Sequence, residues 1–520
     1  GLVGSEMCIR DRLSLLGMMA ALIADKMRPG MVLFSVVVLF LCVGILTPKE
    51  MLEGFSNKGM ITVALLFLVS EGIRQSGTLG QVIKKLLPQG KTTVFKAQLR
   101  ILPSVAFISA FLNNTPVVVI FAPIIKHWAK SVKLPATKFL IPLSYVTILG
   151  GICTLIGTST NLVVHGMILE AGYEGFTMFE LGKVGIFIAI AGIIYLFIFS
   201  KRLLPDARPD TAVPDEEVEE GEKLHRVEAV LGARFPGINK KLSDFNFQRH
   251  YGAEVKEIKT RNGQRYVDHL EDVVLREGDT LVVMADDTFI PTWGESSVFV
   301  LLTNGNDPDT SGKKKRWLAL ILLVLMIVGA TVGELPATKE MFPDIKLDMF
   351  FFVCITTIIM AWTNIFPARK YTKYISWDIL ITIACAFAIS KAMVNSGVAD
   401  CVAGFIIGLS DDYGPHVLLA ILFVITNLFT ELITNNAAAA LAFPLALSIS
   451  AQLGVSPTPF FVVICMAASA SFSTPIGYQT NLIVQGIGNY KFTDFVRIGL
   501  PLNIITFLIS VILIPLIWNF

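Results

Sequence analysis

Two stretches of sequence decide the fold, "NNTPVVVIFAP" at residues 113–123 and "TNNAAAALAFP" at residues 434–444. Both lie inside long apolar regions, yet both carry adjacent asparagines and end on a proline. Polar amides and helix breakers are costly in hydrocarbon, because every backbone polar group there must be satisfied within the protein. Such segments are tolerated at membrane depth only where protein or a cavity satisfies them, so both stretches are candidates for a binding site.

The composition is that of a polytopic helical membrane protein. Of the 520 residues, 53% are hydrophobic and 16% are charged, against about 25% charged residues in a soluble domain. Several apolar runs approach or reach the length of roughly 17–25 residues that a spanning helix needs; they are 31–47, 182–200, 317–332, 349–365 and 496–518. Residues 1–12 resemble translated adapter sequence rather than a signal peptide. We expect them to be artefactual and the first span, about 13–25, to be truncated.

The membrane portion repeats itself around a polar insert. "GTSTNLVVHG" at 157–166 recurs as "GYQTNLIVQG" at 477–486, an offset of 320 (477 − 157), and the two asparagine stretches lie at nearly the same offset. Repetition at one offset indicates a duplication, with repeats expected at 13–200 and 317–520. Between them, linkers at 201–223 and 291–316 enclose residues 224–290, where short alternating apolar runs predict a small α/β domain.

The distribution of basic residues predicts the orientation. Residues 396–464 contain no lysine or arginine, whereas basic residues cluster at 84–100, 126–138, 201–202, 313–316 and 369–373. The positive-inside rule then places the insert, 201–316, in the cytoplasm and the C-terminus outside. Each asparagine stretch is entered and left from one side of the membrane, which predicts a re-entrant hairpin in each repeat.

The predicted fold is therefore an all-α polytopic membrane protein with inverted-topology repeats, each of five spans plus one re-entrant hairpin. We expect it in a bacterial or organellar inner or plasma membrane. Inverted repeats with broken helices at matching positions are typical of secondary transporters. A single asparagine pair is as easily explained by hydrogen bonding between helices. Two pairs at equivalent positions, each followed by a glycine-containing break, favour a site.

The residue types in these motifs suit an anion and a hard cation together. Helix N-termini, hydroxyls and amide N–H groups favour an anion, while amide and unwound backbone carbonyl oxygens suit sodium. Two equivalent half-sites suggest two cation sites around one anion. The four motifs contain no lysine or arginine, so bound sodium would supply the positive charge and make anion affinity sodium-dependent.

Several charged residues in the apolar regions allow two interpretations each. Glu71 and Lys391 occupy equivalent positions (391 − 71 = 320); they either face each other across the pseudo-twofold axis or cap helix ends separately. Glu431 precedes the second tip and is either a proton- or cation-binding carboxylate or a satisfied structural one. His165 matches Gln485, which favours a polar lining position over a metal ligand.

The motifs "FLNNTPV", "GTSTNL", "TNNAAAA" and "PIGYQTN" resemble those of the divalent anion:sodium symporter family, most closely its branch with algal and cyanobacterial sulfate transporters. The resemblance covers about 400 residues of the membrane portion. It implies a homodimer in the lipid bilayer, with a scaffold domain, a moving transport domain and elevator-type alternating access. It also implies sodium as the coupling ion, a small divalent anion as substrate and no nucleic-acid partner.

The resemblance also implies residue roles. The family's Ser-Asn-Thr motif falls on Asn113, Asn114 and Thr115 and on Thr434, Asn435 and Asn436, and Asn114 and Asn435 would bridge sodium and substrate. Its Gly-Thr-Pro-Pro-Asn stretch falls on 157–161 and 477–481. In these two stretches the resemblance implies four sodium ligands, which are Gly157, Asn161, Gly477 and Asn481. It also implies that Thr158 and Tyr478 approach the anion.

This chain departs from the family pattern where the substrate would bind. Both tip serines are replaced, and both proline pairs are replaced by polar residues, 159–160 and 479–480. A bulky Tyr478 stands where dicarboxylate transporters carry threonine, so a compact oxyanion such as sulfate is favoured over a dicarboxylate. A proton-coupled or arsenite-type transporter of the same architecture is the nearest alternative, and Glu431 is the residue that would support it.

The insert resembles the C-terminal ligand-binding subdomain of potassium-conductance regulators, the TrkA-C type, over "RVEAVLGARFPGINKKLSDFNF" and "LREGDTLVVMA". This resemblance implies a regulatory module that dimerises and binds a small ligand, or an inert dimerisation module. An anion channel gated by the insert is a second functional class, but broken helices that meet at one midplane site argue against a continuous pore. No paired catalytic aspartates, HExxH motif or Ser-His arrangement occurs in the spans, so an enzyme is not expected.

Overall fold

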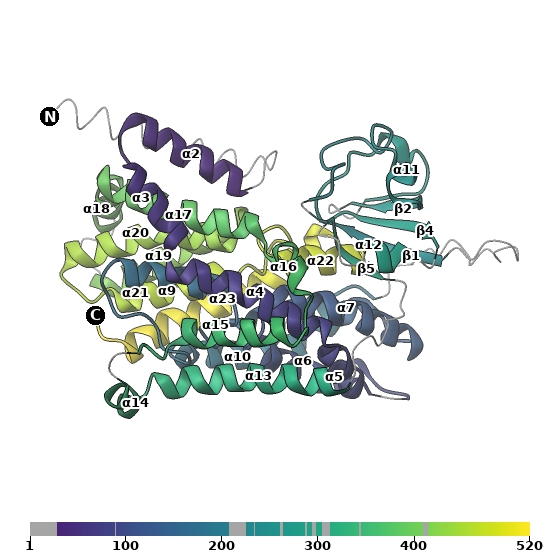
Figure 1. Cartoon of the computed structure of the whole chain (residues 1–520), viewed down its shortest axis with the longest axis horizontal. Coiled ribbons are helices and arrows are strands. Elements are labelled where there is room, and N and C mark those ends of the chain that lie inside the picture. Colours follow the sequence, from purple (N-terminus) through teal and green to yellow (C-terminus); the bar gives the residue numbers. More distant parts are fainter. Residues whose placement is uncertain are drawn as a thin grey trace, which may run out of the picture.

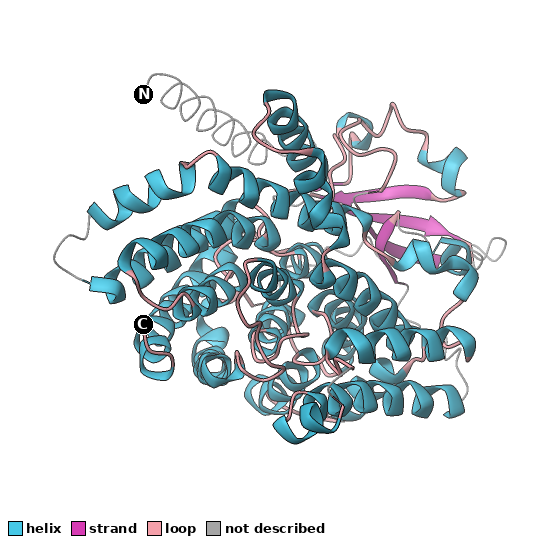
Figure 2. Ribbon diagram, turned by 60° about the vertical axis from the view of Figure 1, so that its left-hand side comes forward, coloured by secondary structure: helices cyan, strands magenta, loops and turns pink. Residues whose placement is uncertain are grey.

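The computed structural model describes residues 29–88, 90–206, 225–232, 234–260, 264–286, 289–293, 298–303, 313–342, 345–408 and 414–520. Seven of the described helices are long and apolar enough to cross a membrane. Helices form one packed body, and a small sheet lies at one end of it (Figures 1 and 2). The predicted helical membrane architecture with a small inserted sheet region is confirmed. The expected artefactual N-terminus, the truncated first span and most of the first linker fall outside the described residues.

The duplication is visible in the order of helices. The first repeat contains α2 (Pro29–Val43), α3 (Pro48–Glu53), α4 (Lys58–Gln75), α5 (Thr78–Leu86), α6 (Val94–Ser109), α7 (Asn114–Ser131), α8 (Leu140–Gly151), α9 (Ser159–Glu170) and α10 (Gly182–Leu203). The second contains α15 (Met349–Trp362), α16 (Tyr371–Tyr374), α17 (Trp377–Asn395), α18 (Val398–Gly408), α19 (Gly414–Leu432), α20 (Asn435–Leu453), α21 (Thr458–Ser469), α22 (Gln479–Gly488) and α23 (Phe492–Ile517), after α13 (Lys313–Gly333) and α14 (Pro336–Met341). From α4 with α17 to α10 with α23, the helices of the two repeats match one to one.

The two repeats run in opposite directions. Asn57 caps the start of α4 and donates to Glu170 at the end of α9. Ile375, just before α17, instead accepts a hydrogen bond from Arg234 of the inserted domain. The inserted domain and α14 lie at opposite ends of the body (Figure 1), so matching helices start at opposite faces.

Each repeat contains a helical hairpin and an interrupted helix. The hairpins are α6–α7, joined at 110–113, and α19–α20, joined at 433–434. Pro116 lies in the first turn of α7, where its missing N–H leaves no helical hydrogen bond unmade. The interrupted helices are α8–α9 and α21–α22, whose two halves are separated by non-helical segments at 152–158 and 470–478.

The helices fall into two groups, those that are buried and those that expose one face. Every residue of α8 is buried, and α20 and α21 are buried along most of their length. By contrast, α10 and α23 each expose a stripe of apolar side chains at four-residue spacing. The stripes comprise Ile186, Ile190 and Ile194 on α10, and Leu500, Ile504 and Leu508 on α23. Such stripes are typical of helix faces that meet lipid.

The inserted domain is an antiparallel sheet in the order β3-β2-β4-β1-β5. Its strands are β1 (His225–Leu231), β2 (Glu254–Lys259), β3 (Arg265–Tyr266), β4 (Thr280–Ala285) and β5 (Phe299–Thr303), with short helices α11 (Phe247–Tyr251) and α12 (Phe289–Trp293). The predicted boundary at residue 290 is wrong, because β5 pairs with β1 and Phe299 is buried in the aromatic core of the domain. A short apolar run among polar residues carries little signal of its own, so the sequence assigns it to the linker.

Two equivalent glycines make the same tight turn in both repeats. Gly77 joins α4 to α5 and Gly397 joins α17 to α18, each with φ of +71°. This left-handed conformation costs a residue with a Cβ about 1–2 kcal/mol. A Ser-Gly pair recurs in the sequence at 76–77 and 396–397, and the turn explains its glycine by a backbone requirement and not by ligand binding.

We expect Gly77→Ala and Gly397→Ala each to lower the free energy of unfolding by about 1–2 kcal/mol, because alanine must adopt the left-handed turn. Thermal unfolding of the purified protein in detergent would show this as a lower midpoint. Gly408→Ala, at a helix end with open space around it and no positive φ, is the control. Equal midpoints for all three variants would contradict the interpretation.

Candidate functional site

The break between α8 and α9 is held by one asparagine. Asn161, in the first turn of α9, donates through Nδ2 to the carbonyl oxygens of Thr154 at 2.9 Å and Gly151 at 3.4 Å. These carbonyls lie at the unwound end of α8, where helical partners are missing. Asn161 is fully buried, so its amide replaces the water that would otherwise satisfy them.

The second repeat has the same arrangement. Asn481, in the first turn of α22, donates to the carbonyl oxygens of Ser471 at 2.9 Å and Thr474 at 3.2 Å. These partners precede Asn481 by ten and seven residues, as the partners of Asn161 do. The Asn481 Oδ1 also accepts from Ser144 Oγ at 2.7 Å, which links the break of the second repeat to α8 of the first.

The two motif glycines allow each break to approach its own hairpin. A Cβ at Gly157 would lie 3.0 Å from the carbonyl oxygen of Ala110, the end of α6. A Cβ at Gly477 would overlap the equivalent carbonyl of Thr430 in α19. Both positions need a residue without a side chain, because backbone meets backbone there.

The Tyr478 hydroxyl joins the two repeats at the centre of the site. It accepts from Asn114 Nδ2 at 2.8 Å and shares a hydrogen bond of 2.9 Å with Thr158 Oγ1. The Asn435 side chain lies near the same hydroxyl. Ser109 donates to Asn114 Oδ1 at 2.8 Å and so fixes which amide atom faces the tyrosine. Three of the predicted substrate-binding residues, Asn114, Thr158 and Tyr478, thus meet at one buried point, and the half-buried Asn435 lies beside it.

A second group of hydrogen bonds crosses between the repeats beside this point. Asn436 Oδ1 accepts from Ser159 Oγ and Thr160 Oγ1, both at 3.2 Å. Thr115 Oγ1 donates to Gln479 Oε1 at 3.3 Å. Three of the four polar residues that stand in place of the family's proline pairs therefore bond to the hairpin tip of the opposite repeat, and the fourth, Thr480, bonds to Ser144 of α8.

Four helices begin at this site, α7, α9, α20 and α22. Their unpaired N–H groups and macrodipoles favour an anion. Two buried polar atoms at the same place have no hydrogen-bond partner among the described residues, Asn161 Oδ1 and Thr434 Oγ1. Buried polar groups are rarely left unsatisfied, so these oxygens are available to a ligand.

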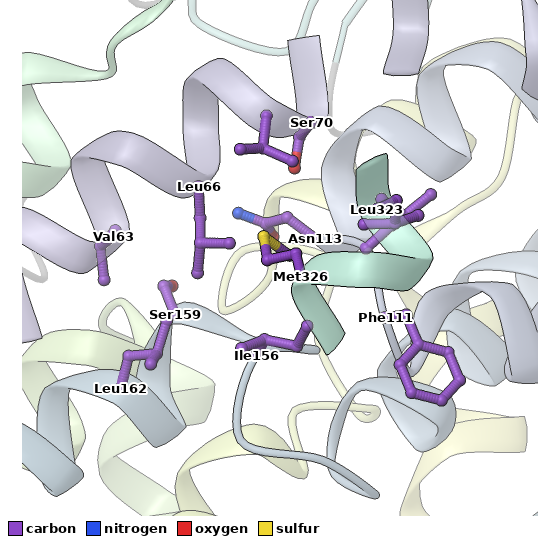
Figure 3. A pocket seen from close by; sticks show the side chains of 12 residues that line it. Val63, Leu66, Ser70, Phe111, Asn113, Ile156, Ser159, Leu162, Leu323 and Met326 are labelled. Atoms are coloured by element: carbon purple, nitrogen blue, oxygen red, sulfur yellow. The ribbon is translucent and has the colours of Figure 1, made fainter. Parts of the chain in front are cut away.

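The side chain of Asn113 points into a small cavity, unlike that of Asn114, which bonds to the Tyr478 hydroxyl. Asn113 stands at the N-cap position of α7 without a capping hydrogen bond from its side chain, and it lines this cavity of about 10 Å³ with Ser70 of α4 and Ser159 of α9 (Figure 3). Apolar side chains close the rest of the wall, among them Leu66, Met326 and Phe111. This cavity adjoins the site on the side of α4 and is wide enough for about one water molecule.

Glu431 is held by several donors. Its Oε1 accepts from the Ser473 backbone N–H at 2.9 Å and from Asn503 Nδ2 at 2.7 Å, and its Oε2 accepts from Ser471 Oγ at 3.3 Å. These contacts favour the structural interpretation of this carboxylate, which ties α19 to the second break and to α23.

Glu71 and Lys391 do not pair with each other. Both carboxylate oxygens of Glu71 accept from Arg74 in the same helix, at 2.6 and 2.7 Å. Lys391 is exposed and lines a large vestibule that His165 also lines. The interpretation in which Glu71 and Lys391 face each other across the pseudo-twofold axis is therefore wrong.

Sequence reasoning missed three residues that support the site, Ser109, Ser144 and Asn503. Each is a polar residue with mostly apolar neighbours in its helix, which is the signal that could have found them. Among the described residues, no group of three or more His, Cys, Asp or Glu side chains could hold a metal ion. A cation at this site would have to use amide, hydroxyl and backbone oxygens.

Comparison with known proteins gives the family. The family model described as citrate transporter matches residues 19–449 and 341–520. An uncharacterized transporter of Synechocystis is 30% identical, with 93% of each chain covered. A putative sulfur deprivation response regulator of Chlamydomonas reinhardtii is 28% identical over 92% of this chain and 96% of its own.

Shorter matches carry more specific names. The probable sodium/sulfate cotransporter 3 of Chlamydomonas reinhardtii is 32% identical over 54% of this chain and 31% of its own length. A sodium-dependent dicarboxylate transporter of Staphylococcus saprophyticus is 25% identical over 28% of each chain. The names indicate a transporter and not an enzyme.

We expect Asn161→Ala and Asn481→Ala to lower the free energy of unfolding by about 1–3 kcal/mol each, because each leaves two buried carbonyls without a donor. Thermal unfolding in detergent would measure the loss. Gln452→Ala, which removes an exposed amide that donates to the carbonyl oxygen of Asp400, is the control. Midpoints that match the control would mean that the two asparagines do not hold the breaks.

Proposed function

Since the chain belongs to the citrate transporter family, we propose that it is a sodium-coupled symporter that carries a divalent oxyanion, sulfate, by elevator-type alternating access. The observation that carries this proposal is the pair of hydrogen bonds from Asn114 and Thr158 to the Tyr478 hydroxyl, with Asn435 beside them. Amide and hydroxyl donors from both repeats meet there beside four helix N-termini. A tetrahedral oxyanion would replace the tyrosine as their shared acceptor.

The size of the site favours sulfate over a dicarboxylate. The Tyr478 ring is buried and fills the space between the two hairpin tips. The Ser159, Thr160 and Gln479 side chains bond across between the two repeats beside it. Relatives named sodium/sulfate cotransporters support sulfate, whereas the relative named for dicarboxylates supports the alternative substrate.

Sodium would bind at the two breaks. Asn161 Oδ1 has no partner in the described residues, and Gly157 and Gly477 lie in the non-helical segments, where their carbonyls are outside a regular helix. These neutral oxygens suit a hard monovalent cation that must be released in every cycle. Sodium would place positive charge beside the anion, which couples the two binding events. The proton-coupled alternative would use Glu431, whose hydrogen bonds to the Ser473 backbone N–H and to Asn503 instead fit a structural carboxylate.

The remaining parts of the proposal concern assembly and orientation. We propose a homodimer with residues 201–316 in the cytoplasm and the C-terminus outside. The exposed apolar stripes of α10 and α23 would lie against lipid or the second subunit. The TrkA-C-like role of the inserted domain, with a small regulatory ligand, is also part of the proposal.

We expect labelled sulfate to enter proteoliposomes when an inward sodium gradient is applied, and excess succinate not to block it, because Tyr478 narrows the site. Uptake in choline or potassium medium is the control for sodium dependence. Block by succinate would instead identify a dicarboxylate transporter. Uptake that is indifferent to sodium would contradict the coupling mechanism.

We expect Asn114→Ala and Asn435→Ala to abolish sodium-driven uptake, because each removes a donor that has no replacement in the buried site. Gln452→Ala is the matched amide control and should transport as the parent does. The size-exclusion profile in detergent would establish that the variants remain folded. Uptake by both variants at the parental rate would overturn the site assignment.

A further inference from the structure

A vestibule leads to the site from the face that carries α14. It has a volume of about 1130 Å³ and is lined by the start of α4, including Asn57 and Thr62, and by Leu162 and His165 of α9. Leu162 also lines the small cavity beside Asn113. The vestibule therefore approaches the site along the contact of α4 with α9 and ends at Leu162.

Inverted symmetry places a matching route on the opposite face. Adding the repeat offset of 320 to Leu162, His165 and Gly166 gives Leu482, Gln485 and Gly486 in α22. The equivalent of the start of α4 is the start of α17. A route from the other face to the site would thus run between the start of α17 and the end of α22.

The inserted domain occupies the mouth of this second route. A Cβ at Gly278 would lie 3.5 Å from Leu482 Cδ2, and a Cβ at Gly486 would lie 3.7 Å from Thr280 Cβ. Arg234 Nη2 donates at 3.5 Å to the carbonyl oxygen of Ile375, just before α17. One domain therefore contacts both helices that should border the route.

We propose that the turn at 276–280 of the inserted domain, with the start of β4, is a lid that closes the access route on its own face of the membrane. Closure holds the site accessible only from the face with the open vestibule. The lid must leave α22 before an anion can pass to the other side. This inference rests on the proposed transport function and adds its regulation.

An ion pair ties the lid domain to the first hairpin. Lys126 Nζ of α7 bonds to both carboxylate oxygens of Glu228 in β1, at 2.9 and 3.0 Å. The same carboxylate accepts from Lys259 at 3.4 Å. Because α7 begins at Asn114, the domain is fastened to a helix that carries a site residue.

The ion pair stays charged at physiological pH. Burial alone would raise the pKa of Glu228, but Lys126 and Lys259 hold it at about 2. A carboxyl whose pKa is lowered in the docked state stabilises docking at every pH above its ordinary pKa of 4.5. This stabilisation is lost as the pH falls from 4.5 towards 2. Mild acidification is therefore not the signal that opens the lid.

The lid interface has the character of a reversible contact. Thr280 Oγ1, which faces Gly486, is buried without a hydrogen-bond partner among the described residues, and so are both amide atoms of Gln485 next to it. Permanent interfaces satisfy nearly all their buried polar groups. These atoms gain water when the domain lifts, which offsets part of the contact that is lost.

A disulfide can test the lid directly. In Thr280→Cys/Gly486→Cys the two Cβ atoms would be 3.7 Å apart, near the mean of about 3.8 Å for natural disulfides. We expect oxidation of this double variant to stop sulfate uptake and dithiothreitol to restore it. The single variants, treated in the same way, control for the other cysteines. Full uptake by the oxidised, cross-linked protein would overturn the proposal.

Charge reversal gives a second test that does not depend on transport. Lys126→Glu should release the domain, so that Leu482→Cys reacts faster with a bulky maleimide in the variant than in the parent background. The swap Lys126→Glu/Glu228→Lys should restore slow labelling, and Leu169→Cys on the open vestibule should label equally in all backgrounds. Equal labelling of Leu482→Cys in all backgrounds would overturn the lid. Labelling as expected without sulfate uptake would leave the lid standing and reject the proposed function.

Discussion

The need to satisfy backbone groups in the middle of two interrupted helices is the constraint on which the rest of the structure depends. A helix that stops inside a membrane protein leaves carbonyls without partners, and no water is available in hydrocarbon to take their place. Asn161 and Asn481 solve this problem in the same way, each by donating to carbonyls seven and ten residues earlier. The breaks can therefore persist, and their free helix N-termini become available to a ligand.

The two repeats share a scaffold but are not symmetric at its centre or at its faces. Tyr478 faces Thr158, its own repeat equivalent, and its hydroxyl bonds to both Thr158 and Asn114 of the first repeat. A duplicated scaffold thus supports one asymmetric centre. The inserted domain lies at one end of the helical body (Figure 1), and its contacts reach α7, α22 and the residue before α17. One face therefore carries an open vestibule, and the equivalent position on the other face is covered.

Much of this protein could be deduced from the sequence because the signals are local or periodic. Apolar run length determines the spanning helices, and repetition at one offset determines the pairing of elements. The asparagine and glycine motifs identify the interrupted segments, since few other residues are tolerated there. The strand at 299–303 was missed because a short, mostly apolar run does not indicate which strand it pairs with. Its pairing with β1 is a long-range contact that only the tertiary structure shows.

Only the tertiary structure decided which polar groups meet. The sequence left Glu71 and Lys391 with two interpretations, and the structure pairs Glu71 with Arg74 because both lie on one helix face three residues apart. Asn113 and Asn114 are adjacent and alike in sequence, yet one lines a small cavity and the other bonds to Tyr478. The sequence by itself determined the helical architecture and the positions of the two hairpins and the two interrupted helices. The partners within the site depend on side-chain directions that are set when two distant repeats pack together.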